Sequence, residues 1–328
     1  MIGSFMAVTR LFFKIPTQSS TTTYTLDLAR ELSKHHRTLI RQKQLFTVYG
    51  GIYQDSDNSN AYFSTAPHYW VTKSAINRGF KAWKKQLSDT MQNHDFAEGS
   101  SSQLKTSKYN DFKIVLDSSH NASATSSNTL PSLDASGIQL PSGEWSYSTL
   151  TRPRPDQPDS NGVYHQFASD QFVVQIVGDH VSSGTSDAQG DLNYSRVSLI
   201  KSWLNSRPTK DNNDDSPLNQ PNLDADPIFQ MFVVGDSDED QAVIDVINDQ
   251  NDTPPYDMDK LYGHNGESAD AGLNLQMQCI VSPDTNSGVA SVAGFQALCG
   301  LVRLEVTGGT GSTGASLILD VESNGVGF

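Results

Sequence analysis

Two stretches in the first hundred residues show the apolar spacing of amphipathic helices. Over residues 27–42, Leu28, Leu32 and Leu39 fall on one side of a helix that turns by about 100° per residue. Over residues 71–92 the recurring apolar positions are Ile76, Phe80, Trp83, Leu87 and Met91. Asp27 or Thr25 is a suitable residue to cap the amino end of the first helix. The pattern predicts two helices, each with one face that packs against the rest of the protein.

Shorter runs, in which apolar and polar residues alternate or β-branched and aromatic residues cluster between turn residues, predict strands. These runs cover residues 7–15, 45–54, 60–65, 109–117, 137–150, 172–177, 273–282, 297–307 and 316–322. Residues 197–205 fit either a short strand or a short helix. Gly50 and Gly51 interrupt the second run and indicate a bulge or a bend there.

Long polar segments separate these elements. Residues 118–136, 179–193 and 207–227 are expected to be surface loop insertions. With about eight to ten strands, no internal repeat and no regular alternation of strand and helix, a doubly wound α/β fold is disfavoured. The sequence predicts one mainly β domain over residues 1–328, a sandwich or jelly roll with two helices inserted in its N-terminal half and long polar loops.

Charge is distributed unevenly along the 328 residues, whose net charge is -14. Residues 1–155 carry 17 Lys and Arg against 11 Asp and Glu, whereas residues 156–328 carry 6 against 26. The two halves are therefore expected to face different environments or partners, although charge does not specify a fold.

The positive charge of the first half is concentrated on the polar sides of the two expected helices. The residues concerned are Arg30, Lys34, Arg37 and Arg41 on the first helix and Arg78, Lys81, Lys84 and Lys85 on the second. Such groups can neutralise nucleic-acid phosphates without reading a base sequence, and Trp70 and Trp83 are candidates for base stacking. Two alternatives stay open, in which the stripes are solvated helix faces or pair with the acidic half of a neighbouring copy. No RRM, zinc-finger or helix-turn-helix signature decides between these roles.

No pattern of catalytic residues stands out. The eight histidines form no HxxxH or Cys/His constellation, and the chain contains no GxSxG, HExxH or DTG motif. The glycine-rich run at residues 308–314 superficially resembles a phosphate loop, but it has no Lys and precedes an expected strand instead of a helix. We expect a β-hairpin loop at this run, and we expect that the protein is not an enzyme.

The acidic run Asp236, Asp238 and Asp240 opens like a calcium-binding loop. Gln241 stands where that loop needs Gly for its sharp turn, and Ile247 stands where it needs a bidentate Glu, which excludes an EF-hand. The favoured interpretation is that Asp238 or Asp240 caps a short helix over residues 241–249. An irregular calcium site at this run is a second interpretation, and no other cofactor or metal site is expected.

The cysteines and the first residues bear on the setting of the chain. Cys279 and Cys299 lie on two expected strands that could pair, so a disulfide is conceivable, but two reduced buried thiols are the favoured interpretation. Residues 1–16 have no basic n-region, and no run reaches the roughly 18 apolar residues of a membrane span. The sequence predicts a soluble chain with no secretory signal and no membrane partner.

Six segments carry a family pattern when they are taken in chain order. They are LARELSKHHRTLIRQKQLFTV, HYWVTKSAINRGFKAWKKQ, YNDFKIVLD, GEWSYSTL, EDQAVIDVINDQNDTPPYD and VAGFQALCGLVRLEV. In order and local pattern they resemble the capsid proteins of circular single-stranded DNA viruses of the CRESS-DNA kind, particularly uncultured environmental ones. The resemblance extends from about residue 27 to residue 306 and rests on no catalytic signature.

This resemblance implies a jelly-roll subunit that assembles with copies of itself into a closed icosahedral shell around viral nucleic acid, single-stranded DNA, in the virion. It implies no enzymatic residue and no particular host receptor. A shell of this kind could use its cationic groups inward and its acidic loops outward. Members of the family commonly begin with an Arg-rich arm, whereas residues 1–29 contain only Arg10 and Lys14 as cations. The two helical stripes would then carry more of the genome binding.

A binding module is the alternative function from a different class. Asp-rich loops and surface aromatic residues would suit a calcium-assisted carbohydrate-binding β-sandwich of the lectin or adhesin type. Glycan binding that a chelator abolishes is the behaviour that this alternative predicts.

Overall fold

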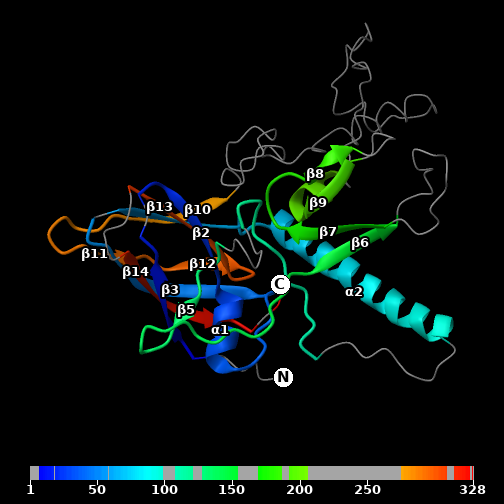
Figure 1. Ribbon diagram of the computed structural model, residues 1–328, viewed down its shortest axis with the longest axis horizontal. Helices are drawn as coiled ribbons and strands as arrows, with labels where there is room; N and C mark the ends of the chain where they lie inside the picture. Colours follow the sequence, from blue (N-terminus) through cyan, green and yellow to red (C-terminus); the bar gives the residue numbers. More distant parts are fainter. Residues whose placement is uncertain are drawn as a thin grey trace, which may run out of the picture. The chain divides into compact units, whose positions relative to one another are not determined.

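The computed structural model describes residues 7–17, 19–57, 59–98, 108–120, 128–153, 169–186, 192–205, 275–308, 314–325 and 327. The chain divides into two compact units, Met1–Trp203 with Glu267–Phe328 and, separately, Leu204–Gly266. Residues 204 and 205 are the only described part of the second unit, so the insertion predicted at 207–227 lies outside the described residues. The first unit is mainly β, with mostly antiparallel sheets and few helices (Figure 1).

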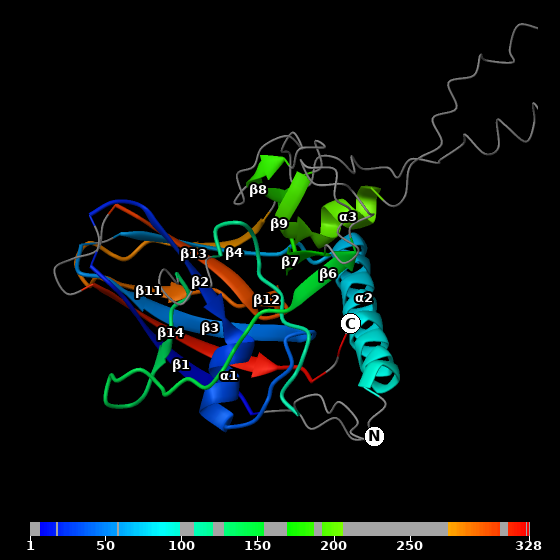
Figure 2. The same ribbon diagram turned by 45° about the vertical axis from the view of Figure 1, so that its right-hand side comes forward.

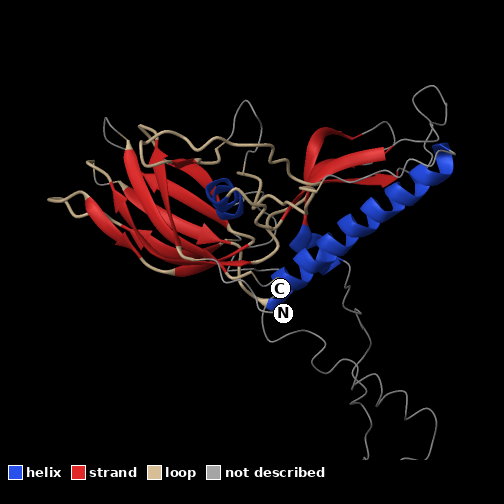
Figure 3. Ribbon diagram, turned by 90° about the horizontal axis from the view of Figure 1, so that it is seen from below, coloured by secondary structure: helices blue, strands red, loops and turns tan. Residues whose placement is uncertain are grey.

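Two antiparallel sheets lie face to face in a sandwich-like arrangement (Figure 3). Sheet A has the strand order β11-β3-β14-β1-β5, with β12 also paired to β3. Its strands are β1 (Thr9–Ile15), β3 (Leu45–Gln54), β5 (Ser132–Leu133), β11 (Val289–Val292), β12 (Phe295–Leu298) and β14 (Ala315–Ser323). Sheet B has the order β10-β4-β13-β2. Its strands are β2 (Thr22–Asp27), β4 (Asn60–Thr65), β10 (Gln276–Val281) and β13 (Leu301–Thr307).

The facing sides of the two sheets bury the main core. In β1 buried and exposed residues alternate without interruption, with Leu11, Phe13 and Ile15 inside. Phe63 and Leu304 approach the same core from sheet B. Because side chains alternate between the two faces of a strand, this period of two makes one face apolar and leaves the other outside. The strands predicted at 7–15, 45–54, 60–65, 273–282 and 316–322 are confirmed within three residues at each end.

The bulge predicted in β3 is also confirmed. The register between β3 and β14 shifts between Asp320 and Val321, which lie opposite Gly50 and Val48, so Tyr49 is the extra residue. Gly51 lies so close to β14 that a Cβ atom on it would stand 2.0 Å from the carbonyl oxygen of Ile318. The second glycine is therefore required for the two strands to pair.

Residues 128–148, which we call the strap, close one edge of the sandwich. Thr25 N donates to Asn128 O and Leu130 N donates to Thr25 O, each at 3.0 Å, so the strap first extends sheet B beside β2. The next residues form β5, which pairs with β1 and extends sheet A. The strap therefore links the outer strands of both sheets, and part of the loop predicted at 118–136 is ordered on the core.

Two predicted strands are wrong because their backbone groups have other partners. In the segment predicted at 109–117, Ile114 N donates to Gln42 Oε1 at 2.6 Å, and Ile114 O accepts from Gln42 Nε2 at 3.1 Å. In the segment at 137–150, Leu140 N donates to Ser132 O at 3.0 Å and Ser148 N donates to Lys113 O at 2.7 Å. Only the last two residues of this segment enter a strand. Phe112, Ile114, Val115 and Leu116 are nevertheless buried. The segment contributes one isolated parallel bridge, from Val115 to Gln175 beside β7, and not a strand.

Between β4 and β10 the chain forms a third sheet and two helices. Sheet C has the order β6-β7-β9-β8, in which β7 and β9 run parallel. The elements are α2 (Trp70–Glu98), β6 (Thr149–Pro153), β7 (Ser169–Gln175), β8 (Val181–Ser186), β9 (Leu192–Ser198) and α3 (Leu199–Asn205). Helix α2 is longer than the helix predicted at 71–92, and β8 occupies part of the loop predicted at 179–193. Residues 197–205 contain both of the predicted alternatives, the end of a strand and then a helix. With these elements the described residues contain fourteen strands, more than the eight to ten predicted.

The glycine-rich run at 308–314 does not close a hairpin. Strand β13 before it pairs with β2 and β4 in sheet B, and β14 after it pairs with β1 and β3 in sheet A. Since both edges of each strand are already occupied, β13 and β14 cannot pair with each other. The run connects the two sheets, and the hairpin prediction is wrong.

The two cysteines are free thiols. Cys279 lies on β10, which pairs with β4, and Cys299 lies in the turn between β12 and β13. β10 and β13 are separated by β4 and do not pair with each other. Of the favoured interpretation, two reduced buried thiols, the free thiols are confirmed, but only Cys299 is buried and Cys279 is half-buried.

Candidate nucleic-acid interface

Helix α1 (Leu28–His36) begins where the sequence predicts. Asp27 is its N-cap, and Asp27 Oδ1 accepts a hydrogen bond from Arg30 N at 3.1 Å. Leu28, Ala29 and Leu32 are buried against the core. The cap and the apolar face together fix which way the polar side chains of the helix point.

The helix ends at His36, six residues earlier than predicted. Arg37 adopts a left-handed conformation with φ of 52°, and the chain turns back so that Ile40 N donates to Ser33 Oγ at 2.9 Å. Burial of Ile40 holds the turn in place. Arg37 and Arg41 therefore lie outside the helix, and the prediction of four cations in one helical stripe is wrong.

Glu31 is a buried acid within this cationic region. Its carboxylate accepts from Lys34 Nζ at 2.8 Å and 3.0 Å, and Arg30 Nε lies 3.8 Å away. The same carboxylate accepts from Ser132 N at 2.9 Å and Ser132 Oγ at 2.6 Å. Glu31 thus ties the strap to α1 and partly neutralises two of the predicted binding cations.

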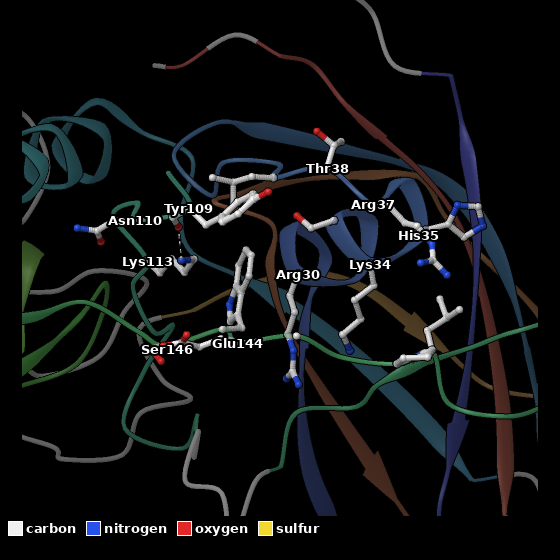
Figure 4. A pocket seen from close by; sticks show the side chains of 16 residues that line it. Arg30, Lys34, His35, Arg37, Thr38, Tyr109, Asn110, Lys113, Glu144 and Ser146 are labelled. Carbon is white, nitrogen blue, oxygen red and sulfur yellow. Dashed lines mark hydrogen bonds between the residues drawn. The ribbon is translucent and has the colours of Figure 1, made fainter. Parts of the chain in front are cut away.

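A pocket of about 730 Å³ opens between α1, the strap and the segment before residue 114. Three of the predicted cations line it, together with aromatic and polar groups that come from other parts of the chain (Figure 4). We call it the α1 pocket. Its lining residues are Arg30, Ser33, Lys34, His35, Arg37, Thr38, Leu39, Tyr109, Asn110, Lys113, Leu140, Pro141, Gly143, Glu144, Trp145 and Ser146. Figure 4 shows Arg30 and Lys34 extending from the same side of α1, with Tyr109 and Lys113 on the facing segment.

The lining of the α1 pocket is strongly cationic. Four of its side chains are Lys or Arg, and Glu144 is the one acid among them. Arg30 Nε is buried without a hydrogen-bond partner among the described residues. Burial lowers the pKa of Lys34, against the opposing effect of Glu31. A pocket with four cations in its lining is suited to phosphate oxygens.

An aromatic ring stands beside these cations. Lys113 Nζ lies 4.8 Å from the centre of the Trp145 ring, and it also donates to Tyr109 O at 3.4 Å. The Tyr109 side chain is exposed, whereas Trp145 is half-buried. Rings of this kind can stack on bases while the cations hold the backbone.

Behind the pocket, Asp27 joins the strap to the helix a second time. Asp27 Oδ2 accepts from Trp145 Nε1 at 3.0 Å and from Tyr147 Oη at 3.1 Å. Burial raises the pKa of Asp27 to about 6, despite the hydrogen bond from Arg30 N, which lowers it. The position of Trp145 in the pocket therefore depends on a buried carboxylate.

The network continues to His120, whose tautomer follows from its contacts. Nδ1 accepts from Leu116 N at 3.2 Å, so Nε2 carries the proton of the neutral ring. Nε2 lies 3.1 Å from Tyr147 Oη and 3.3 Å from Thr129 Oγ1. Burial lowers the pKa of His120 to about 3, which keeps the ring uncharged. Tyr147 Oη then accepts a hydrogen bond from His120 Nε2 and donates one to Asp27 Oδ2, so each of these three side chains has a defined donor or acceptor role.

The remaining predicted cations lie elsewhere. Arg41 is exposed and its Nη1 lies 3.7 Å from Asp111 Oδ1, outside the lining of the α1 pocket. The α2 stripe, which consists of Arg78, Lys81, Lys84 and Lys85, is exposed along α2. The structure therefore keeps the two predicted groups as separate surfaces. Three cations of the first group line the α1 pocket, and the four cations of the second group form the α2 stripe.

The aromatic residues predicted for stacking have packing partners. Trp83 is half-buried and its ring centre lies 5.9 Å from those of Phe80 and Phe112. The Trp70 ring lies edge-on to Trp203 at 5.1 Å. Trp83 is thus mainly a core residue, and the pocket supplies Trp145 and Tyr109 instead.

Sequence reasoning missed Lys113, Tyr109, Trp145 and the structural role of Glu31. The sequence predicts a strand over residues 109–117, whose alternation places Lys113 on the outside, whereas this residue is buried in the structure. The signal that could have found Trp145 is its position in the Ser-rich, turn-forming stretch PSGEWSYS, since a large aromatic residue in such a stretch needs a partner.

The acidic run Asp236, Asp238 and Asp240 lies outside the described residues. In the part of the chain that the structure does describe, no group of three or more His, Cys, Asp or Glu side chains could hold a metal ion. No helix among those residues is long and apolar enough to cross a membrane.

Comparison with known proteins adds no relative. Neither a family model, nor a curated protein, nor a solved structure matches the chain.

Proposed function

We propose that this chain is the structural subunit of a viral capsid, a jelly-roll protein that assembles with copies of itself into an icosahedral shell around single-stranded DNA. The observation that carries the proposal is the nested pairing of the strands. In the sandwich β1 pairs with β14, β2 with β13, β3 with β12 and β11, and β4 with β10. The first strand thus pairs with the last, the second with the one before it, and so on inward.

Nested antiparallel pairing is what results when one long hairpin of eight strands is rolled into two sheets, which is the jelly roll. On this interpretation β11 and β12 are two halves of one strand, since both pair with β3. α1 lies in the connection between the second and third strands, and α2 with sheet C lies between the fourth and fifth. Jelly rolls occur in capsid subunits and in lectins, so the fold leaves two classes of function.

The α1 pocket favours the nucleic-acid role over carbohydrate binding. Its lining has four cations, one acid and two aromatic rings, which suits phosphates with attached bases better than an uncharged sugar. Arg10 forms a bidentate pair with Asp320 at 2.7 Å and 2.8 Å, so one of the two cations before residue 30 is already engaged. Genome contacts then fall to the α1 pocket and the α2 stripe.

Purified protein should form uniform spherical particles in negative-stain electron microscopy, and the chain is then a component of the virion. Monomers that persist across pH and salt would refute the shell. If the protein stays monomeric, its binding of nucleic acid can still be measured separately with a fluorescent single-stranded oligonucleotide.

Three charge-reversal variants test the α1 pocket and the α2 stripe separately. Arg37→Glu changes the α1 pocket at an exposed position, and Lys81→Glu with Lys85→Glu changes the α2 stripe. Lys201→Glu on α3 is the matched control, because Lys201 belongs neither to the α2 stripe nor to the lining of the α1 pocket. The first two variants should lower the 260/280 nm absorbance ratio of particles and reduce the salt dependence of oligonucleotide binding by about 0.7 per lost phosphate contact. An unchanged ratio and slope in both variants would refute the assignment of these surfaces.

A further inference from the structure

The outer face of sheet A carries a row of apolar side chains. Phe12 lies opposite Leu133 on one side and Ile318 on the other, and Ile318 lies opposite Ile52. The row therefore crosses β5, β1, β14 and β3, which are successive strands of sheet A. Figure 2 shows β1, β14 and β3 side by side. Phe12 is 40% exposed and Ile52 is 45% exposed.

Such a row is unusual on a solvent-facing sheet. A sheet with one face on the core normally alternates apolar residues inside with polar residues outside. The inner positions of these strands follow that rule, since Leu11, Phe13, Leu317 and Leu319 are buried. Apolar side chains aligned across four strands on the opposite face mark a surface that binds a partner.

The charged residues on either side of the row are positive on β1 and negative on β14. On this face β1 presents Arg10 and Lys14, whereas β14 presents Asp320 and Glu322. Arg10 lies opposite Asp320 one row away from Phe12 and Ile318, and Lys14 lies opposite Ser316 one row away on the other side. A cationic strand and an acidic strand are thus neighbours on one face.

We propose that this face packs against the same face of a second copy, about a two-fold axis that runs parallel to the strands between β1 and β14. Rotation about that axis places β1 of one copy over β14 of the other, and every residue keeps its position along the strand direction. Phe12 then lies over Ile318 and Arg10 lies over Asp320, so apolar groups meet apolar groups and opposite charges meet. Two sheets can pack in this aligned way at about 10 Å.

The charges select this axis over the perpendicular one. An axis along the apolar row would place β1 over β1 and would bring Arg10 of one copy over Lys14 of the other, two like charges that oppose association. The inference deepens the proposed self-assembly by naming the face and the symmetry of one contact, and it rests on that proposal.

Two single charge reversals test the contact. Arg10→Glu and Asp320→Arg each place like charges on this face, both within the chain and across the axis. Each variant alone should associate at least about tenfold more weakly than the wild-type chain in sedimentation velocity. An equimolar mixture of the two should recover association, because residue 10 of each copy then faces an opposite charge at residue 320 of the other. The double variant should recover too, which separates a lost contact from a lost fold.

The apolar row is tested with a matched pair. Ile52→Asp should weaken association, whereas Ile280→Asp, at a comparably exposed site on β10 in sheet B, should leave it unchanged. Far-UV circular dichroism and the melting temperature check that each variant is folded.

Three outcomes would overturn the inference. In the first, the single reversals associate like wild type; in the second, their mixture associates no better than either alone. In the third, Ile52→Asp lowers the free energy of unfolding but not association, which means that the chain's own residues cover the row. Shells that form normally in all variants refute this contact and leave the proposed function standing, whereas a wild-type chain that stays monomeric refutes both.

Discussion

Replacing Glu31 should destabilise the protein more than replacing any exposed acid near the α1 pocket. The Glu31→Ala change removes an acceptor from Ser132 N and Oγ and removes the partner of Lys34, whose side chain is only 7% exposed. A buried donor left unsatisfied costs about 1–3 kcal/mol, and breaking a buried ion pair costs about 3–5 kcal/mol. Because both costs arise from the same carboxylate, we expect a total loss of about 3–5 kcal/mol in the free energy of unfolding.

Two further variants divide this loss into its parts. Glu31→Gln keeps an oxygen for Ser132 but offers an amide to Lys34, so it should cost less than Glu31→Ala. Adding Lys34→Met to Glu31→Ala should recover part of the stability, because no ammonium is then left unpaired. Glu144→Ala is the control, since Glu144 is exposed, and it should change the free energy of unfolding by no more than about 0.5 kcal/mol.

Denaturant unfolding and hydrogen exchange measure the two consequences of the change. Unfolding followed by circular dichroism gives the free energy, and exchange at residues 128–133 reports whether the strap separates from α1. A Glu31→Ala variant within about 1 kcal/mol of wild type, with unchanged exchange in the strap, would refute the role given to this carboxylate. Failure of Lys34→Met to recover stability would refute only the contribution of the unpaired ammonium.

Three other changes have defined outcomes. Raising the pH from about 4 to about 7 should lower the free energy of unfolding by up to ~3 kcal/mol through Asp27. The reason is that the folded carboxyl, with a pKa of about 6, binds its proton more tightly than the unfolded one. Denaturant titrations at several pH values measure this dependence of the unfolding free energy on pH, and Asp27→Asn should remove it. Gly51→Ala should prevent sheet A from forming, since its Cβ would meet the carbonyl oxygen of Ile318, whereas Gly143→Ala, with open space around it, should leave the melting temperature unchanged. Tyr147→Phe should cost about 1–3 kcal/mol in chemical denaturation by leaving buried polar partners unsatisfied.

The strands of the sandwich could be predicted because their pattern is local. In β1 and β14 every second residue is buried, and this period is visible in the sequence without knowledge of the partner strand. The segment 109–117 has a similar apolar content but is held by the side chain of Gln42, which is 72 residues from Ile114. A contact over that distance leaves no trace in local periodicity.

The candidate site could be predicted only on its helical side. Arg30 and Lys34 follow from helical spacing, and Arg37 reaches the pocket although the helix ends just before it. Lys113 and Trp145 enter from segments that follow α1 by more than 70 residues, so only the fold brings them together. Glu31 is fully buried and accepts hydrogen bonds from Ser132, a contact between residues 101 positions apart that local spacing does not reveal.

The nested pairing has a consequence for when the protein can fold during synthesis. β13 and β14 are the inner strands of sheets B and A, and each lies between strands that belong to the first 65 residues. A ribosome must therefore make more than 200 intervening residues before the early strands can receive their central partner. Until then, β1, β2, β3 and β4 have unpaired edges that a chaperone must cover or that a neighbouring nascent chain could capture. A chain cut before β14 leaves β1 and β3 without the strand that joins them, so a translation product that stops before β14 cannot complete sheet A.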